Sequence, residues 1–221
     1  MPRTWSSELR EYSHERSMKN WDRPPPDISV AELFERWMPD AFAASGQRAP
    51  AGAPIVRASI SGAGGGSWDV HADGATLSVR APGREPPDIW IRQSVADLRA
   101  ALGPADADLP ELLPPGWSAR DLLFADPADV DLVKQLSGRL AFEIEGRRRR
   151  RWVLDIGFGK AGVSAGRPRT TIRIDGATFE GVRAGTIAPM QTLLDGRLKI
   201  EGDRALAMQV LLLVGSRLGR R

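Results

Sequence analysis

Cysteine is absent from the 221-residue chain, histidine occurs only twice, and lysine is confined to Lys19, Lys134, Lys160 and Lys199. Without cysteine the protein has no disulfide bond, no thiolate metal site and no thiol catalysis. The polar N-terminal sequence lacks the apolar region of a signal peptide, and no apolar run approaches the ~20 residues that span a bilayer. These absences predict a soluble, cytoplasmic protein.

The basic residues are almost all arginine, and their excess over acidic residues is small. The formal net charge is +3, although the isoelectric point is about 9.8. An excess of this size, spread over the whole chain, does not predict nucleic-acid binding. Hydrophobic residues make up 42% and charged residues 27% of the chain, which is typical of a chain that folds around a core.

Residues 1–27 are polar, mixed in charge and end in RPPPD. A proline triplet is a stiff, extended connector, so this segment is predicted to be an arm, available to a partner protein. The sequence SVAELFERWMPDAFAA then predicts a helix, because Ser29 can cap it and apolar residues recur at helical spacing.

Short alternating runs separated by glycine and proline follow this helix and predict a meander of strands. The runs lie at 56–60, 68–72, 77–79 and 89–91. Helices are predicted over 94–102 and 127–138. A short strand, DLLFAD, is predicted between them at 121–126.

An internal repeat is the most informative feature of the sequence. Three positions of ISGAGGGSW recur 84 residues later in IEGRRRRRW: Ile60, Gly62 and Trp68 match Ile144, Gly146 and Trp152. Ile89 and Ile91 match Ile172 and Ile174 with one residue lost. The spacing predicts two copies of one α+β unit, with Trp68 and Trp152 at equivalent strand positions.

The segment PMQTLLDGRLKIEGD predicts a helix at 189–194 and a one-sided strand at 197–201, followed by an apolar helix at 203–215. Between Ala205 and Val214 this terminal helix has only one polar residue, Gln209. We therefore expect it to be buried on both sides, or to face a ligand, a partner or the other repeat.

This segment, with GRLAFEIEG at 138–146 and TIRIDGATFEGVRAGTIA at 171–188, resembles the sterol carrier protein type 2 family, also called non-specific lipid-transfer proteins. The resemblance covers 138–214 well and 29–137 weakly, because a proline-rich connector at 103–118 replaces a helix-turn-strand element of the family. It implies a mostly antiparallel five-stranded sheet with helices over one face. An apolar tunnel for acyl chains, sterols or acyl-CoA would lie between sheet and helices.

The predicted fold class is accordingly α+β, with two tandem sterol-carrier-like units. Each unit is expected to be a mostly antiparallel sheet of about five strands with helices over one face. The predicted boundaries are an arm at 1–27, a divergent first unit at 28–137 and a second unit at 138–221.

The resemblance implies a lipid site in the second unit, walled by apolar side chains of the sheet and the helices. The predicted lipid-binding residues are Phe142, Leu154, Ile172, Met190, Leu193, Leu194, Ile200, Met208, Leu211 and Leu212. The same residues also fit an ordinary close-packed core, and only the volume between them separates the two interpretations.

Five consecutive arginines form the strongest charge feature, at the position where the first copy has AGGGS. They are Arg147, Arg148, Arg149, Arg150 and Arg151. One interpretation is a solvated hairpin tip. The other is contact with an anionic surface, such as phospholipid headgroups or a CoA phosphate, where each basic residue contributes about 1 kcal/mol.

Three motifs with chemical associations lack the context that the chemistry needs. GVSAG at 162–166 matches a nucleophile elbow but has no histidine after it. GFGKAG at 157–162 matches a dinucleotide fingerprint, but no helix is predicted after it, so a hairpin turn is favoured. His71 between Asp69 and Asp73 is more typical of a solvated strand face than of a metal site. We predict no catalytic residue, no metal and no cofactor.

The sequence therefore favours a non-enzymatic carrier of a lipid or acyl chain that makes peripheral contact with anionic membranes. The alternative is an interaction module of the same fold without a ligand. Such a module would bind a partner protein or assembly through the apolar C-terminal helix and the N-terminal arm.

Overall fold

The computed structural model of the protein describes residues 24–46, 48–104, 108–112, 127–159 and 170–218. In the first half these residues form, in chain order, α2 (Val30–Glu32), η1 (Leu33–Trp37), α3 (Met38–Ala44), β1 (Val56–Ser61), β2 (Gly66–Asp73), β3 (Thr76–Arg80), β4 (Ile89–Ser94) and α4 (Val95–Leu102). The predicted first helix, the four predicted strands and the helix after them are confirmed.

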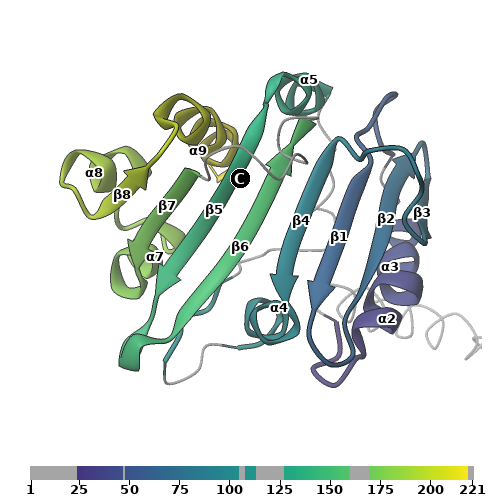
Figure 1. The fold of residues 1–221 in the computed structure, drawn as a ribbon, viewed down its shortest axis with the longest axis horizontal. Helices are drawn as coiled ribbons and strands as arrows, with labels where there is room; N and C mark the ends of the chain where they lie inside the picture. The colour runs from purple at the N-terminus through teal and green to yellow at the C-terminus, as the bar shows by residue number, and fades with distance from the viewer. Residues whose placement is uncertain (1–23, 47, 105–107, 113–126, 160–169, 219–221) are drawn as a thin grey trace, which may run out of the picture.

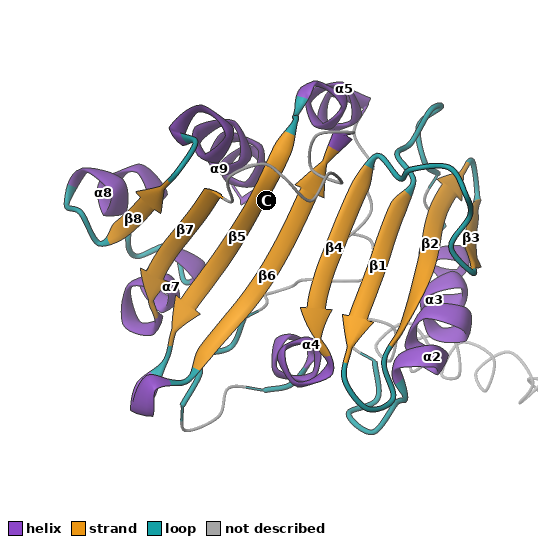
Figure 2. Cartoon of the chain, viewed as in Figure 1, coloured by secondary structure: helices purple, strands orange, loops and turns teal. Residues whose placement is uncertain are grey.

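The second half contains α5 (Pro127–Gln135), β5 (Gly138–Glu145), the short helical turn η3 (Arg147–Arg149), β6 (Arg151–Phe158), β7 (Thr170–Asp175), α7 (Gly176–Arg183), α8 (Pro189–Leu194), β8 (Leu198–Glu201) and α9 (Arg204–Leu218). Helices α7, α8 and α9 gather at the β7–β8 end of the structure, whereas α2 and α3 lie at the β2–β3 end (Figure 2). The predicted strand at 121–126 lies outside the described residues.

The first helical stretch shows how local sequence sets its geometry. Ser29 Oγ accepts the Glu32 N–H at 3.1 Å, and the Glu32 carboxylate accepts the Ser29 N–H at 3.2 Å, which is a capping box. Pro39 further along has no N–H to bond the carbonyl four residues earlier. The Met38 N–H bonds the Leu33 carbonyl instead, so Leu33–Trp37 forms a π-helical turn.

The strands form one mixed sheet of eight in the order β3-β2-β1-β4-β6-β5-β7-β8 (Figure 1). The α+β class is confirmed, but the expected pair of five-stranded sheets is one continuous sheet. The two halves meet where β4 pairs antiparallel with β6, with Ile91 opposite Ile156 and Arg92 opposite Asp155. Hydrogen bonds across this seam between β4 and β6 therefore join the strands of the two predicted units into one sheet.

One face of the sheet is apolar across its whole width and packs against helices. In the first half, Ala58, Ile60, Trp68 and Val70 pack with Leu33, Phe34 and Phe42. In the second half, strand residues such as Leu140, Ile144 and Ile172 pack with Leu206, Ala207 and Val210 of α9. Alternate side chains point to one face, so the ladder pairs Val56–Ile89 and Ile91–Ile156 place both clusters on the same side.

The opposite face carries ion pairs between neighbouring strands. Arg57 on β1 donates to both carboxylate oxygens of Asp69 on β2, at 2.6 and 2.9 Å, and the Gly83 N–H also bonds Asp69 at 2.7 Å. In the second half Arg139 likewise bonds both oxygens of Asp155. This face is polar and the other is apolar. An apolar ligand pocket, as expected from the sequence, could therefore form only on the face that packs against the helices.

The two halves share the same strand connections. Each has an antiparallel hairpin, β1–β2 or β5–β6, whose first strand also pairs in parallel with a later strand, β4 or β7. The later strand runs directly into an eight-residue helix, α4 or α7, capped by Ser94 or Asp175. The strand orders β2-β1-β4 and β6-β5-β7 are therefore equivalent.

The pairing register corrects two of the residue matches. Ile60 lies opposite Gly66, whereas Ile144 lies opposite Trp152, so the second hairpin is two residues longer and Trp68 and Trp152 are not equivalent in register. Likewise Val56 pairs with Ile89 but Leu140 pairs with Thr170, which makes Ile91, not Ile89, the counterpart of Ile172. Sequence identity at a fixed spacing does not reveal that the second hairpin is two residues longer.

The Arg57–Asp69 pair generates a pH-dependent prediction. The hydrogen bonds from Arg57 hold the pKa of Asp69 below its ordinary value, against the opposing effect of burial. A lowered folded-state pKa gives stability that is present above the ordinary pKa and is lost as the pH falls through the lowered value. Asp69→Asn should lower the free energy of unfolding by about 3 kcal/mol at neutral pH, because it leaves Arg57 unpaired.

Urea unfolding of both proteins between neutral and acidic pH checks this. The difference should shrink as the pH falls below the ordinary carboxyl range and through the lowered pKa of Asp69, because the wild-type carboxylate then becomes protonated as well. Asp73→Asn, at an exposed position of the same strand, is the matched control and should change stability by less than about 0.5 kcal/mol. A difference that stays constant or grows at acid pH contradicts the prediction.

Candidate functional site

The apolar layer under the second half is the first candidate site, because the predicted lipid-binding residues fall around it. Ile172 is buried in the core cluster of this half. Phe142, Leu154, Leu193, Ile200 and Leu211 are only partly buried and pack against that cluster. Met208 is also partly buried. The structure therefore brings most of the predicted residues to one side of the sheet, next to α7, α8 and α9.

Three predicted lipid-binding residues lie at the surface instead. The exposed fractions of Met190, Leu194 and Leu212 are 49%, 77% and 63%. In this state these side chains do not enclose a cavity. Their place in a lipid site stays a prediction that requires helices α8 and α9 to move or to meet an apolar partner.

Helix α9 is not buried on both sides, which leaves the alternative that one side faces a ligand, a partner or the other repeat. Leu206, Ala207, Val210 and Leu213 are buried, but Gln209 and Leu212 are exposed. The helix thus has one packed face and one open face. The apolar sequence did not indicate that Leu212 would lie on the open face.

Aromatic contacts join α7 to this apolar layer. The ring of Phe142 on β5 meets Trp152 edge-to-face with centroids 6.4 Å apart, and it meets Phe179 on α7 at 6.3 Å. Val182 of α7 also packs against the cluster. One side of α7 is therefore a wall of the apolar layer.

The second candidate is the arginine tip, residues 147–151, which closes the β5–β6 hairpin. The Arg150 N–H bonds the Arg147 carbonyl at 2.9 Å, and the two residues between them have positive φ, 51° at Arg148 and 63° at Arg149. Such a turn favours Asn-Gly. Two arginines in this conformation are strained by about 1–3 kcal/mol each.

The base of the arginine tip is fixed by the rest of the protein. Arg150 lies 3.8 Å from Asp97 on α4, and Arg151 lies 3.3 Å from Glu143. The Trp152 indole donates to the Asp97 carbonyl at 2.7 Å. These contacts give Arg150 and Arg151 a structural role. The sequence did not distinguish these two arginines from the other three.

The connector 108–112 also holds the tip. The Arg147 N–H bonds the Asp108 carbonyl at 2.8 Å. At Gly146 a Cβ would come within 2.0 Å of the same carbonyl oxygen, so only glycine allows the connector to approach. The Gly146 match in the repeat thus has a packing reason in this half.

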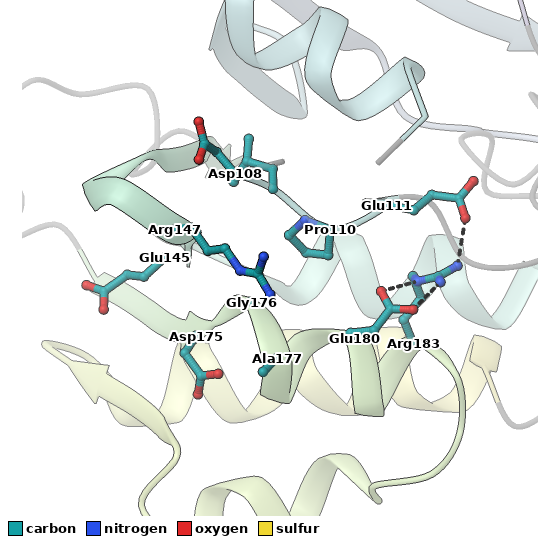
Figure 3. Close-up of a pocket in the computed structure, with 12 residues that line it drawn as sticks. Asp108, Pro110, Glu111, Glu145, Arg147, Asp175, Gly176, Ala177, Glu180 and Arg183 are labelled. Atoms are coloured by element: carbon teal, nitrogen blue, oxygen red, sulfur yellow. Dashed lines mark hydrogen bonds and ion pairs between the residues drawn. The ribbon is translucent and has the colours of Figure 1, made fainter. Parts of the chain in front are cut away.

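A pocket of about 590 Å³ lies between the arginine tip, the connector and the start of α7. Its charged lining residues are Asp108, Glu111, Glu145, Arg147, Asp175, Glu180 and Arg183. Figure 3 shows the Arg147 guanidinium extending over Pro110 and Gly176, while Asp108, Glu145 and Asp175 point away from it.

Most of these charges are already engaged. Arg183 bonds both Glu180 and Glu111, the latter at 3.1 Å, and Arg183 lowers the pKa of Glu180. Burial alone would raise the pKa of Asp175. The hydrogen bonds that this carboxylate accepts at the start of α7, from Thr178 above all, outweigh burial and lower it.

This pocket was not predicted from the sequence. Asp175 followed by Thr178 is a helix-start signal that could have placed the beginning of α7. No local pattern, however, indicates that the connector 108–111 folds against a hairpin tip some forty residues further on.

The remaining motifs yield little chemistry in the part of the chain that the structure describes. His71 is half-buried in the β2–β3 ladder opposite Ser78. No group of three or more metal-ligating side chains occurs among the described residues. Both GVSAG and the end of GFGKAG lie outside them. Among the helices that are described, none has the length and apolar character to cross a membrane.

Comparison with known families matches residues 119–214 to the SCP-2 sterol transfer family. The chain is also similar to hydroxysteroid dehydrogenase-like protein 2 of Xenopus tropicalis and of Xenopus laevis. Each is 32% identical over 89 residues, which is 38% of this chain and 21% of that protein. The chain thus spans about a fifth of the length of these relatives.

Similar solved structures include the sterol carrier protein domain 2 of Helicoverpa armigera and sterol carrier protein 2 like 2 of Aedes aegypti. The first is 18% identical, and the match covers 41% of this chain and 76% of the Helicoverpa armigera domain, with a TM-score of 0.31. The second is 15% identical, and the match covers 38% of this chain and 91% of the Aedes aegypti protein, with a TM-score of 0.27. The family match at residues 119–214 confirms the sterol-carrier resemblance inferred from the sequence for the second half.

The backbone of the arginine tip generates a stability prediction. Replacing Arg148 by Asn and Arg149 by Gly should raise the free energy of unfolding by about 1 kcal/mol or more, because these residues adopt positive φ at lower cost. The control Arg148→Gln with Arg149→Gln removes the same charges without relieving the backbone. Thermal unfolding should rank Asn-Gly above Gln-Gln, and equal midpoints would show that the turn is not strained.

Proposed function

Because residues 119–214 carry the SCP-2 sterol transfer match, we propose that the protein is a lipid carrier whose ligand lies in the second half. The site is the apolar layer between the sheet and helices α7, α8 and α9. The observation that carries this proposal is incomplete packing. Large apolar side chains on three sides of the layer, including Phe142, Leu193 and Leu211, remain only partly buried.

Binding at this site would come from removal of apolar surface from water. Each methylene group that enters the layer contributes about 0.8 kcal/mol, and exposed Leu194 and Leu212 offer further apolar surface beside it. Such a site selects by length and shape rather than by hydrogen bonding, so we expect broad specificity for acyl chains or sterols. We further propose that the protein carries its ligand without chemical reaction and that it acts in the cytoplasm.

We also propose that the chain consists of an arm at 1–27 and two related units at 28–137 and 138–221. The equivalent strand orders and the capped helices after β4 and β7 support this. At the seam, β6 lies antiparallel to β4 just as β8 lies antiparallel to β7. Each unit would therefore lend the other a neighbouring strand.

A second function is favoured by one observation, the exposed apolar residues at the β8 end. Met190, Leu194 and Leu212 give α8 and α9 an outward apolar surface. An interaction module would use this surface, with the N-terminal arm, to bind a partner protein or assembly. The two functions differ in whether the layer beneath α9 admits a ligand.

Binding of a fluorescent fatty acid tests the lipid site. Met208→Glu places a charge on the partly buried side of α9 and should abolish probe binding, because an unpaired charge next to an apolar ligand costs several kcal/mol. Gln209→Glu adds the same charge at the adjacent exposed position and should leave binding unchanged. Equal binding by wild type and a folded Met208→Glu variant would remove the lipid site from the second half.

Separate expression of the two halves tests the two-unit proposal. Residues 138–221 alone would expose the edge of β6 that β4 normally pairs, so we expect self-association or loss of stability. Addition of residues 24–137 should restore a 1:1 complex of the two halves that unfolds cooperatively. A stable, monomeric second half on its own would show that the units do not depend on each other.

A further inference from the structure

We propose that the arginine tip and the pocket beside it dock on an anionic phospholipid membrane. Arg148 and Arg149 would lie against the surface, and Arg147 would bind one headgroup phosphate inside the pocket. This rests on the proposed carrier function, since a carrier must meet a membrane to exchange its ligand.

Strain and charge both indicate that the outer arginines are kept for contact rather than for stability. Arg148 and Arg149 are exposed and hold positive φ, and the Arg148 side chain is 82% exposed. The equivalent turn of the first half is glycine-rich and carries no charge. Strained backbone at an exposed position is a feature of functional sites.

The structural arginines make the tip rigid. Arg150 and Arg151 are tied to Asp97 and Glu143, and the backbone of Arg147 is tied to Asp108. Arg148 and Arg149 are therefore presented on a fixed turn, which reduces the ordering cost when they bind phosphate groups.

The availability of Arg147, not the overall charge of the pocket lining, favours a negatively charged ligand. Each lining carboxylate has a partner: Asp108 lies 3.8 Å from Arg148, Glu145 lies 3.3 Å from Arg173, Asp175 caps α7, and Glu111 and Glu180 bond Arg183. Among the described residues, Arg147 alone of the charged lining groups has no oppositely charged or capping partner within 4 Å. Its guanidinium reaches into the hollow (Figure 3), in a geometry suited to a phosphate.

The position of α7 links this surface to the proposed lipid site. Ala177, Glu180 and Arg183 face the pocket, whereas Phe179 and Val182 pack against the apolar layer. A membrane docked at the pocket would therefore touch the helix that walls the ligand layer. A free phosphate-bearing metabolite would not need the exposed Arg148 and Arg149.

A nucleic acid is the less favourable partner. Single strands bind where aromatic rings stack on bases beside basic residues. Trp152, the aromatic residue next to the tip, is buried and donates its indole N–H to Asp97. The tip therefore offers charge without a stacking surface.

Sedimentation of the full chain with vesicles tests the proposal. Vesicles of phosphatidylcholine mixed with phosphatidylserine should bind the wild type at low salt, and binding should weaken as the Debye length falls to ~8 Å at physiological salt. The triple variant Arg147→Gln, Arg148→Gln, Arg149→Gln should bind about a hundredfold more weakly, since each basic residue at an anionic surface contributes about fivefold.

The matched control removes the same charge elsewhere. Arg48, Arg84 and Arg99 are exposed residues of the first half, and their replacement by Gln should leave most of the binding. Within the tip, Arg147→Gln should weaken binding more than Arg149→Gln, because only Arg147 reaches into the pocket. Thermal unfolding confirms that each variant is folded.

Several results would overturn the proposal. One is that the wild type does not bind phosphatidylserine vesicles at low salt, or that it binds vesicles of phosphatidylcholine alone equally well. Another is that the two triple variants lose binding equally. A third is that the tip binds a single-stranded oligonucleotide instead of vesicles. Equal losses in the two single variants would overturn the role of the pocket. Loss of vesicle binding with intact fatty-acid binding removes only this inference, whereas the reverse removes the carrier function.

Discussion

The antiparallel pairing of β4 with β6 is the interaction on which the rest of the structure depends. It joins two similar sets of strands into one sheet, with Ile89 opposite Phe158 and Arg92 opposite Asp155. Without it, two inner strands with apolar faces would become open edges, which proteins avoid because such edges pair with other chains. On the polar side of the seam Arg92 stacks on Trp90 at 4.0 Å while Arg139 holds Asp155. The seam is thus closed by both backbone hydrogen bonds and side chains.

A sheet joined in this way has one apolar and one polar face across all eight strands, and the two faces have different uses. Ion pairs such as Arg57–Asp69 link neighbouring strands on the polar face. Every described helix that packs in the two core clusters does so on the apolar face. Ligand binding in the second half would therefore take place between sheet and helices. Asp97 of the first half pairs with Arg150 and so helps to hold the arginine tip.

The strands and helices could be predicted because their signals are local. Alternation at Val56, Ala58 and Ile60 marks β1, and Ser29 with Glu32 marks the first helix. The sterol-carrier resemblance lies in residues such as Pro189–Leu194 and the strand after it, which the structure confirms as α8 and β8. Alternation of apolar and polar residues, however, does not indicate which strand pairs with which. The pairing of Ile91 with Ile156 could therefore not be predicted. Nor does it reveal a hairpin that is two residues longer, which is why the two tryptophans were wrongly matched.

The site was predicted less completely, for a physical reason. An apolar residue in a helix can face the core or the solvent with the same sequence around it. Leu193 and Leu211 pack inward while the adjacent Leu194 and Leu212 are exposed. Likewise five identical arginines gave no indication of their different surroundings. Arg150 pairs with Asp97 of the distant α4, Arg151 pairs with Glu143 across the hairpin, and Arg147 lines a pocket with the connector.

Native mass spectrometry of the purified full chain tests the central claim, lipid binding in the second half, most directly. A carrier should release a lipid of discrete mass at one copy per chain, and Met208→Glu should lose that species while Gln209→Glu keeps it. A protein that shows only its own mass, and gains none when incubated with fatty acids or sterols, would contradict the carrier function and favour the interaction module.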